Sequence, residues 1–129
     1  TTANRMLVEG CYFDLPDTDN TIGISLPGTP DGVIIRDNIM IGDWGTAAIS
    51  SVGASTRLCI VGNHIYNVAA GADNVISADA ATSGICARNL TANTDGEAAG
   101  ITANGLAINL NYHGNVAEDL SGRLEPIAT

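Results

Sequence analysis

The stretch Val33–Ile41, VIIRDNIMI, places one asparagine in the middle of an otherwise aliphatic run. Read alone, it predicts a β-strand interrupted by a turn residue. The same arrangement recurs in LCIVGNHIY at 58–66, GICARNLTA at 84–92 and LNYHGNVAE at 110–118. The asparagines of the four stretches are Asn38, Asn63, Asn89 and Asn115. They follow one another at intervals of about 26 residues, and such regular spacing indicates a repeat protein.

A second feature repeats with nearly the same period. An isoleucine followed by serine or threonine occurs in GISL, AISS, VISA and GITA, at Ile24, Ile49, Ile76 and Ile101. Segments rich in Gly, Asp, Asn and Ala, such as TPDG and AAGADN, separate the two features and predict tight turns. Two independent motifs with a common period predict a structural unit of about 26 residues.

Within each unit, the residues three and five positions before the asparagine are mostly apolar. They are Val33 and Ile35, Leu58 and Ile60, Gly84 and Cys86, and Leu110 and Tyr112. This period of two predicts a strand with one face turned inward. The intervening Ile34, Cys59 and Ile85 are apolar as well, so the phase of the strand stays open by one residue.

A unit of strands and turns that closes after about 26 residues predicts an all-β fold, a parallel β-solenoid of about four to five coils. We expect coils at Met6 to about Pro30, 31–57, 58–83 and 84–107, with an incomplete coil from Ile108. The whole chain, 1–129, would form one module, with 121–129 as a C-terminal tail or cap. Inward asparagines at one corner would bond to each other as an amide ladder. An antiparallel sandwich, with turns every 8–12 residues, has no reason to keep this register.

The repeated motifs IIRDNI, CIVGNHI, ICARNL and NYHGNV, with Ile-Ser/Thr pairs between them, resemble the right-handed parallel β-helix of the pectate-lyase-like superfamily. The resemblance covers about residues 6–120. It implies a right-handed parallel β-helix. That superfamily includes polysaccharide lyases, polygalacturonases, and phage tailspikes and related virion proteins. In character the chain is most similar to the tailspike and virion β-helix modules.

Composition excludes several classes of partner. The chain has 14 acidic residues, five basic residues that are all arginine, and a net charge of −9. Binding to nucleic acid or to an anionic membrane depends on clustered Lys and Arg, so we expect neither partner. No apolar run approaches the ~18 residues of a membrane span. The chain starts without Met and shows no signal peptide, so we expect a processed product or part of a longer protein.

Three cysteines, Cys11, Cys59 and Cys86, are too few for a disulfide scaffold. Cys59 and Cys86 lie in apolar strand-like runs, and we expect both to be buried free thiols. The step from Cys59 to Cys86 is one residue longer than the step from Asn63 to Asn89, so the two thiols are out of register with the asparagines. The sequence carries no C-x-x-C or His-rich pattern for zinc.

Catalytic candidates are few. Glycoside hydrolysis needs two carboxylates across a cleft, but the residues in register with Asp37 are Gly62 and Arg88. His64 is expected to point outward or to pack between turns. His113 lies in YHG, which is similar to the Gly-His-Gly of polygalacturonases but lacks the first glycine, so we interpret it as a turn residue.

A metal site is the remaining candidate. Asp14, Asp17 and Asp19, in DLPDTD, are oxygen ligands of the kind that Ca²⁺ prefers. The segment lacks the spacing of an EF-hand, and a solvated acidic turn is the alternative interpretation. We therefore assign no cofactor, with Ca²⁺ as the only candidate.

Two functions follow from the sequence. The first is a non-catalytic structural and interaction module of a virion appendage or extracellular filament, with glycans as candidate ligands. The second is a fragment of a polysaccharide lyase or glycoside hydrolase. A solenoid of few coils exposes strand edges at both ends. We therefore expect a homo-oligomer, either a trimer or an end-to-end stack, or binding to other virion or filament proteins, and an extracellular or virion location.

Overall fold

The computed structural model describes residues 5–15, 22–68, 74–78, 82–93, 100–103, 109–113, 116–118 and 124–126. Strands and turns make up these segments, and none of them contains a helix. The strands are β1 (Leu7–Glu9), β2 (Tyr12–Leu15), β3 (Ile22–Leu26), β4 (Ile34–Arg36), β5 (Ile39–Gly42), β6 (Ala47–Ser51), β7 (Leu58–Val61), β8 (His64–Asn67), β9 (Asn74–Ala78), β10 (Ser83–Ala87), β11 (Leu90–Asn93), β12 (Gly100–Ala103), β13 (Asn109–His113), β14 (Val116–Glu118) and β15 (Leu124–Pro126).

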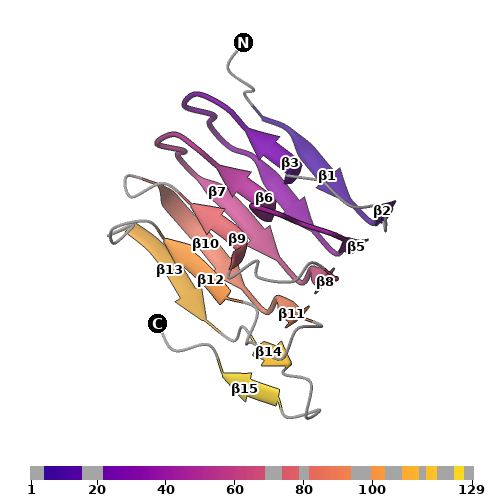
Figure 1. Ribbon diagram of the computed structural model, residues 1–129. Helices are drawn as coiled ribbons and strands as arrows, with labels where there is room; N and C mark the ends of the chain where they lie inside the picture. Colours follow the sequence, from indigo (N-terminus) through magenta and orange to yellow (C-terminus); the bar gives the residue numbers. More distant parts are fainter. Residues whose placement is uncertain are drawn as a thin grey trace.

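The strands form three sheets, and the chain passes through them in turn (Figure 1). The first sheet has the order β1-β4-β7-β10-β13, the second β2-β5-β8-β11-β14-β15, and the third β3-β6-β9-β12. From β1 to β14, neighbouring strands within a sheet are therefore always three strands apart in the chain. The predicted all-β class with parallel sheets is confirmed, and the arrangement is compatible with a parallel β-solenoid.

Register within the sheets follows the sequence period. Ile34 pairs with Cys59 in the first sheet and Ile39 with His64 in the second, and the members of each pair are one repeat apart in the chain. These neighbours are parallel. The exception is β15, which pairs antiparallel with β14 at one end of the second sheet.

Burial settles the phase that the sequence left open. Val33, Ile35, Leu58 and Ile60 are at most 1% exposed, so this set of alternate residues faces the core. Full burial of such an aliphatic side chain contributes about 1.5–3 kcal/mol. Their neighbours turn the other way: Ile34 is 36% and Ile85 43% exposed, and Cys59 is half-buried.

The cysteines divide accordingly. Cys86 pairs with the inward Ile60 and is buried as predicted, whereas Cys59 pairs with the outward Ile85. The prediction that Cys59 is buried is therefore wrong. The physical reason is that the apolar runs occupy both faces of the first sheet, so an apolar setting does not by itself indicate an inward position.

The isoleucines of the second motif stack in the third sheet. Ile24 pairs with Ile49 and Ile49 with Ile76, and Ile101 continues the register beside Ile76. The side chains of Ile24, Ile49 and Ile76 are all buried in the core. Equivalent residues thus lie on one another over successive units.

The single tryptophan fills the core near the second and third sheets. Trp44 is fully buried, and its indole Nε1 donates to the Tyr66 carbonyl oxygen at 3.2 Å. Its backbone N–H donates to Asn67 Oδ1 at 3.0 Å. A Cβ on Gly42 would lie 2.6 Å from the indole ring, and a Cβ on Gly23 would lie 2.9 Å from it. Glycine at these positions therefore makes room for the ring.

Candidate functional site

The asparagines of the repeat form a buried column. Asn38 Nδ2 donates to Asn63 Oδ1 at 2.9 Å, and Asn63 Nδ2 donates to Asn89 Oδ1 at 3.0 Å. All three side chains are at most 1% exposed. Asn115, the fourth residue that the sequence placed in this ladder, lies outside the described residues.

Backbone groups complete the ladder. The backbone N–H of Asn38 donates to Asn63 Oδ1 at 3.2 Å, and that of Asn63 to Asn89 Oδ1 at 3.0 Å. Each Nδ2 also donates to a carbonyl of the preceding unit: Asn38 to Val8 at 3.1 Å, Asn63 to Ile35 at 3.0 Å and Asn89 to Ile60 at 3.0 Å. The ladder thus satisfies backbone groups that the turns leave without a sheet partner.

The ladder has a direction and an N-terminal end. Each of the three Oδ1 atoms accepts a hydrogen bond from the backbone N–H at the equivalent position of the preceding unit. The Nδ2 atoms of Asn38 and Asn63 each donate to one oxygen in the preceding unit and one in the following unit. In the first unit Cys11 occupies the position of the ladder asparagine. This follows because the next residue, Tyr12, pairs with Ile39, the residue after Asn38. The backbone N–H of Cys11 donates to Asn38 Oδ1 at 2.9 Å, but its side chain supplies no amide.

The residue before each ladder position has a positive φ. The values are 62° at Gly10, 54° at Asp37, 68° at Gly62 and 54° at Arg88. This left-handed conformation turns the chain from the first sheet into the second. The repeat period alone did not predict this conformation, although glycine at two equivalent positions, Gly10 and Gly62, was the available signal.

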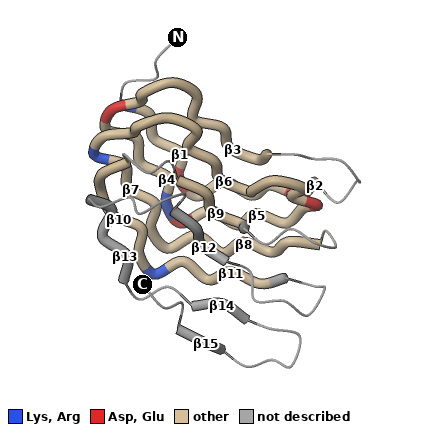
Figure 2. The backbone as a smooth tube through the Cα atoms, turned by 60° about the vertical axis from the view of Figure 1, so that its left-hand side comes forward, with Lys and Arg blue, Asp and Glu red and all other residues tan. Residues whose placement is uncertain are grey.

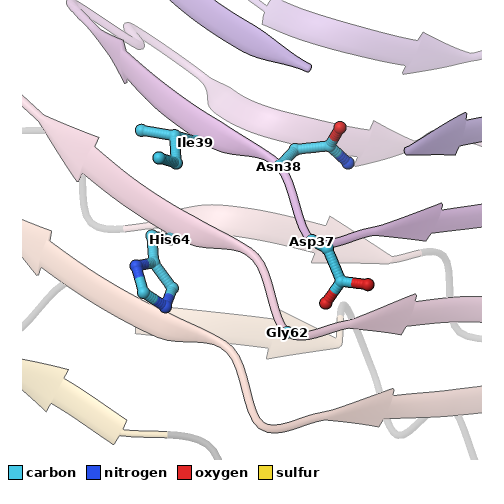
Figure 3. Close-up of a pocket in the computed structure, with 5 residues that line it drawn as sticks. All are labelled: Asp37, Asn38, Ile39, Gly62 and His64. Atoms are coloured by element: carbon cyan, nitrogen blue, oxygen red, sulfur yellow. The ribbon is translucent and has the colours of Figure 1, made fainter. Parts of the chain in front are cut away.

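A shallow open depression of about 270 Å³ lies on the outer side of this turn. It is lined by Asp37, Asn38, Ile39, Gly62 and His64 (Figure 3). Figure 3 shows the Asp37 carboxylate directed toward Gly62 and the His64 ring on the strand beside it. A Cβ on Gly62 would lie 2.6 Å from Asp37 Oδ1. The glycine therefore provides the space that the carboxylate occupies.

The chemistry available in this depression is limited to one carboxylate and one imidazole. His64 is exposed, in agreement with the outward orientation expected for it. The positions in register with Asp37 hold Gly62 and Arg88, so no second carboxylate stacks on it. The described residues contain no group of three or more His, Cys, Asp or Glu side chains that could hold a metal ion.

Of the candidate calcium ligands, only Asp14 can be placed. It lies in β2 with its side chain exposed, and Asp17 and Asp19 lie outside the described residues. The Ca²⁺ prediction therefore stays a prediction. The side chain of His113 is also outside the described part.

Among the described residues, two ion pairs join positions about one repeat apart in the sequence. Arg36 lies 2.6 Å from Glu9, and Arg57 Nε donates to Asp31 Oδ1 at 2.8 Å. The Arg57 hydrogen bonds, with a further one from Thr56, lower the pKa of Asp31 to about 2. Figure 2 shows that charged residues are sparse along the described backbone. Both pairs are exposed and act as local ties between units rather than as a charged site.

The thiols have different environments. Burial raises the pKa of Cys86 to about 12, so this thiol is protonated at neutral pH. Cys11 is exposed, with its Sγ 3.5 Å from the Glu9 carbonyl oxygen. Burial thus disfavours the thiolate form of Cys86 in the folded protein.

The outer face of the second sheet carries apolar residues, which hydrophobicity alone does not distinguish from core residues. Tyr12 pairs with Ile39, Ile39 with His64, and His64 with Leu90. Tyr12 is 61% exposed and Ile39 42%. The depression described above therefore borders a column in which the apolar side chains of Tyr12, Ile39 and Leu90 flank His64.

Comparison of the chain with protein-family models, with curated proteins and with solved structures found no match. The membership of the pectate-lyase-like superfamily therefore stays a prediction. Among the described residues, no helix has the length and apolarity required to cross a membrane.

Proposed function

We propose that the chain is a non-catalytic structural and interaction module, folded as a right-handed parallel β-helix of about four to five coils with roughly 26 residues in each. The observation that carries the proposal is the asparagine column. Asn38, Asn63 and Asn89 use their buried amides to join consecutive units. Their functional groups are therefore committed to holding the stack together.

The distribution of reactive groups supports a structural role. A glycosidase needs two carboxylates about 5–9.5 Å apart, and the register of the turns gives Asp37 no acidic neighbour in its column. Asp31, a second exposed carboxylate, is bonded to Arg57 and Thr56. Of the side chains that line the depression, Asp37 is the one carboxylate and His64 the one imidazole.

We further propose that the module belongs to a virion appendage or an extracellular filament. Support comes from the sequence resemblance to tailspike β-helices and from the repeated architecture, which extends by adding units. The acidic net charge of −9 favours solubility of such an assembly. The exposed column of Tyr12, Ile39 and His64 on the second sheet provides a contact surface for neighbouring proteins or for the apolar faces of sugars.

The experiment that tests the non-catalytic role is incubation of the protein with acidic polysaccharides, with and without Ca²⁺. A lyase would release unsaturated ends, which absorb in the ultraviolet, and a hydrolase would release reducing ends. We expect neither product under either condition. Release of either product, abolished by Asp37→Asn (D37N), would overturn the proposal and identify the turn as catalytic.

A further inference from the structure

The turn before β4 contains a chemically labile dipeptide, Asp31–Gly32. In an Asp-Gly sequence the backbone nitrogen of the glycine can attack the side-chain carboxyl group of the aspartate, because glycine has no Cβ to obstruct the approach. The described residues contain no other Asp-Gly sequence. Gly32 has a φ of 70°, a left-handed conformation that favours glycine. The shape of the turn therefore favours the residue that makes Asp31 labile.

The reaction open to this dipeptide requires only water as a co-reactant. The Gly32 nitrogen forms a bond to Asp31 Cγ and gives up its proton, while the protonated carboxyl group loses its hydroxyl, so one water molecule leaves and a succinimide ring forms. Water then opens the ring. Cleavage between the nitrogen and Cγ restores aspartate, whereas cleavage between the nitrogen and the main-chain carbonyl carbon of Asp31 gives isoaspartate. The mass of the chain is unchanged, but its backbone contains one additional methylene group.

Three hydrogen bonds hold the Asp31 carboxylate away from this reaction. Thr56 Oγ1 donates to Oδ1 at 2.7 Å, and Arg57 Nε donates to the same oxygen at 2.8 Å. Arg57 Nη2 donates to Oδ2, so the guanidinium binds both carboxylate oxygens. These bonds fix the rotation of the side chain. They also lower the pKa of Asp31 to about 2, so the neutral acid that the attack consumes is scarce above this pH.

The attacking nitrogen is held as well. The backbone N–H of Gly32 donates to the Thr56 carbonyl oxygen at 2.9 Å. On the other side of the same peptide group, the Asp31 carbonyl oxygen accepts from the backbone N–H of Arg5 at 2.8 Å. The peptide group is therefore fixed between the preceding and the following unit. Closure of the succinimide ring would require the bond between Gly32 and Thr56 to break.

The labile glycine and the arginine that binds its neighbour occupy equivalent turns. Ile34 pairs with Cys59, so Gly32 and Arg57, each two residues earlier, are equivalent positions of successive units. Both have a positive φ, 70° at Gly32 and 54° at Arg57. One unit thus has glycine at this turn, and the next unit has an arginine whose side chain binds the carboxylate beside that glycine.

We propose that Asp31 is a latent site of isoaspartate formation, and that Thr56 and Arg57 of the next unit prevent this modification in the folded protein. Isomerisation would move the carboxylate away from Arg57. The additional methylene would also displace Asp31 from its parallel bridge with Thr56. The modification would therefore separate the two units at this turn. The inference is independent of the proposed structural role.

The test is the rate at which isoaspartate forms at Asp31. Folded and urea-denatured protein are incubated at about pH 5, above the ordinary Asp pKa. Peptide mapping with electron-transfer fragmentation distinguishes isoaspartate from aspartate, and Asp95–Gly96, the other Asp-Gly sequence of the chain, verifies the chemistry in the denatured sample. We expect the folded wild-type protein to form isoaspartate at Asp31 at least about tenfold more slowly than the denatured protein, because the reacting groups are bonded and the neutral acid is depleted.

Arg57→Met (R57M) removes the paired hydrogen bonds. We expect it to accelerate the reaction in the folded protein about tenfold or more, because a pKa that returns from about 2 toward 3.8 increases the fraction of neutral acid by at least that factor. Thr56→Val (T56V) removes one bond, so a smaller acceleration is expected. Arg57→Lys keeps the charge but not the paired geometry, and its rate should lie between those of wild type and R57M.

Arg36→Met (R36M) is the matched control. It removes another exposed arginine–carboxylate pair, with Glu9, and leaves the bonds to Asp31 in place. The rate at Asp31 should therefore equal that of wild type. Fluorescence of the buried Trp44 verifies that each variant is folded.

Three results would overturn the inference. The first is an equal rate at Asp31 in folded and denatured wild-type protein. The second is a folded R57M protein that reacts no faster than wild type, or, where R57M does not fold, a folded T56V protein with an unchanged rate. The third is an equal acceleration by R36M, which would assign the effect to general loss of stability. None of these results bears on the polysaccharide test, so the two proposals fail separately.

Discussion

Among substitutions in the asparagine ladder, we expect Asn63→Ala to lower the free energy of unfolding most. Asn63 Oδ1 accepts from both the backbone N–H and Nδ2 of Asn38. Its Nδ2 donates to the Ile35 carbonyl and to Asn89 Oδ1. Asn63→Ala (N63A) removes these four hydrogen bonds, and a longer fifth one from Nδ2 to the Val61 carbonyl oxygen at 3.4 Å, at a site that is 0% exposed.

The magnitude follows from which groups lose their partners. The buried backbone N–H of Asn38 loses its acceptor, which costs about 1–3 kcal/mol, and each remaining bond contributes about 0.5–1.5 kcal/mol. We expect N63A to lower the free energy of unfolding by about 3–5 kcal/mol, a large part of the roughly 5–15 kcal/mol of a typical domain. The midpoint of thermal unfolding would fall by roughly 10–20 °C.

The matched comparison is Asn38→Ala (N38A) at the end of the same ladder. Asn38 Oδ1 accepts from the backbone N–H of Cys11, which is an exposed residue at an edge where water can replace the bond. N38A should therefore cost about 1–2 kcal/mol less than N63A. His64→Ala, at an exposed position next to Asn63, should stay within about 0.5 kcal/mol of wild type.

Urea unfolding followed by the fluorescence of Trp44, the single and fully buried tryptophan, measures these differences. The midpoint should shift while the dependence on denaturant stays constant, because the surface exposed on unfolding is nearly unchanged. A loss below about 1 kcal/mol for N63A, or equal losses for N63A and N38A, would refute the reasoning that the buried N–H sets the magnitude.

Two further predictions concern titratable groups. The pKa of Asp31 is lowered from 3.8 to about 2, so the Asp31–Arg57 pair stabilises the fold above pH 3.8 and loses this contribution as the pH falls toward 2. Carboxyl NMR titration should show the low value and its return toward 3.8 in Arg57→Met, and an unchanged value in that variant would contradict the assignment. Cys11 should react with a thiol reagent in the native protein, whereas Cys86 should react only on unfolding, because burial raises its pKa to about 12. Mass spectrometry of labelled peptides separates the two sites, and native labelling of Cys86 would show that the core is open.

The sequence was sufficient to predict which residues stack. The spacing between Asn38 and Asn63 is also the spacing between the residues that pair in the adjacent strands. This works because parallel stacking repeats the same environment in every unit, so like residues recur at like positions. The polar residue within an aliphatic run was informative because a buried amide requires partners.

The orientation of residues outside the core could not be predicted in the same way. Ile34, Cys59 and Ile85 are apolar but point outward, and hydrophobicity alone does not distinguish the two faces of a strand that is apolar on both. Only the structure, by placing Val33 and Ile35 in the core, resolves the phase.

The site itself was the least predictable part. The depression depends on the left-handed conformation of Asp37 and on the absence of a side chain at Gly62. A positive φ at an aspartate is uncommon, so the residue type alone does not indicate it. The place of Cys11 at the ladder position of the first unit was likewise not evident from the period, because the departure from asparagine is a single residue.

The most direct measurement of the central claim is the proximity of the asparagine side chains in solution. In protein labelled with ¹⁵N-asparagine, nuclear Overhauser spectra should connect the side-chain amide of Asn63 with those of Asn38 and Asn89. Asn38 and Asn89 should show no mutual cross-peak, because two strand spacings separate them by about 9.6 Å. Slow exchange of these amide protons with water is expected for groups that are at most 1% exposed. Side-chain amides that exchange rapidly and show no contacts between these three residues would contradict the stacked ladder.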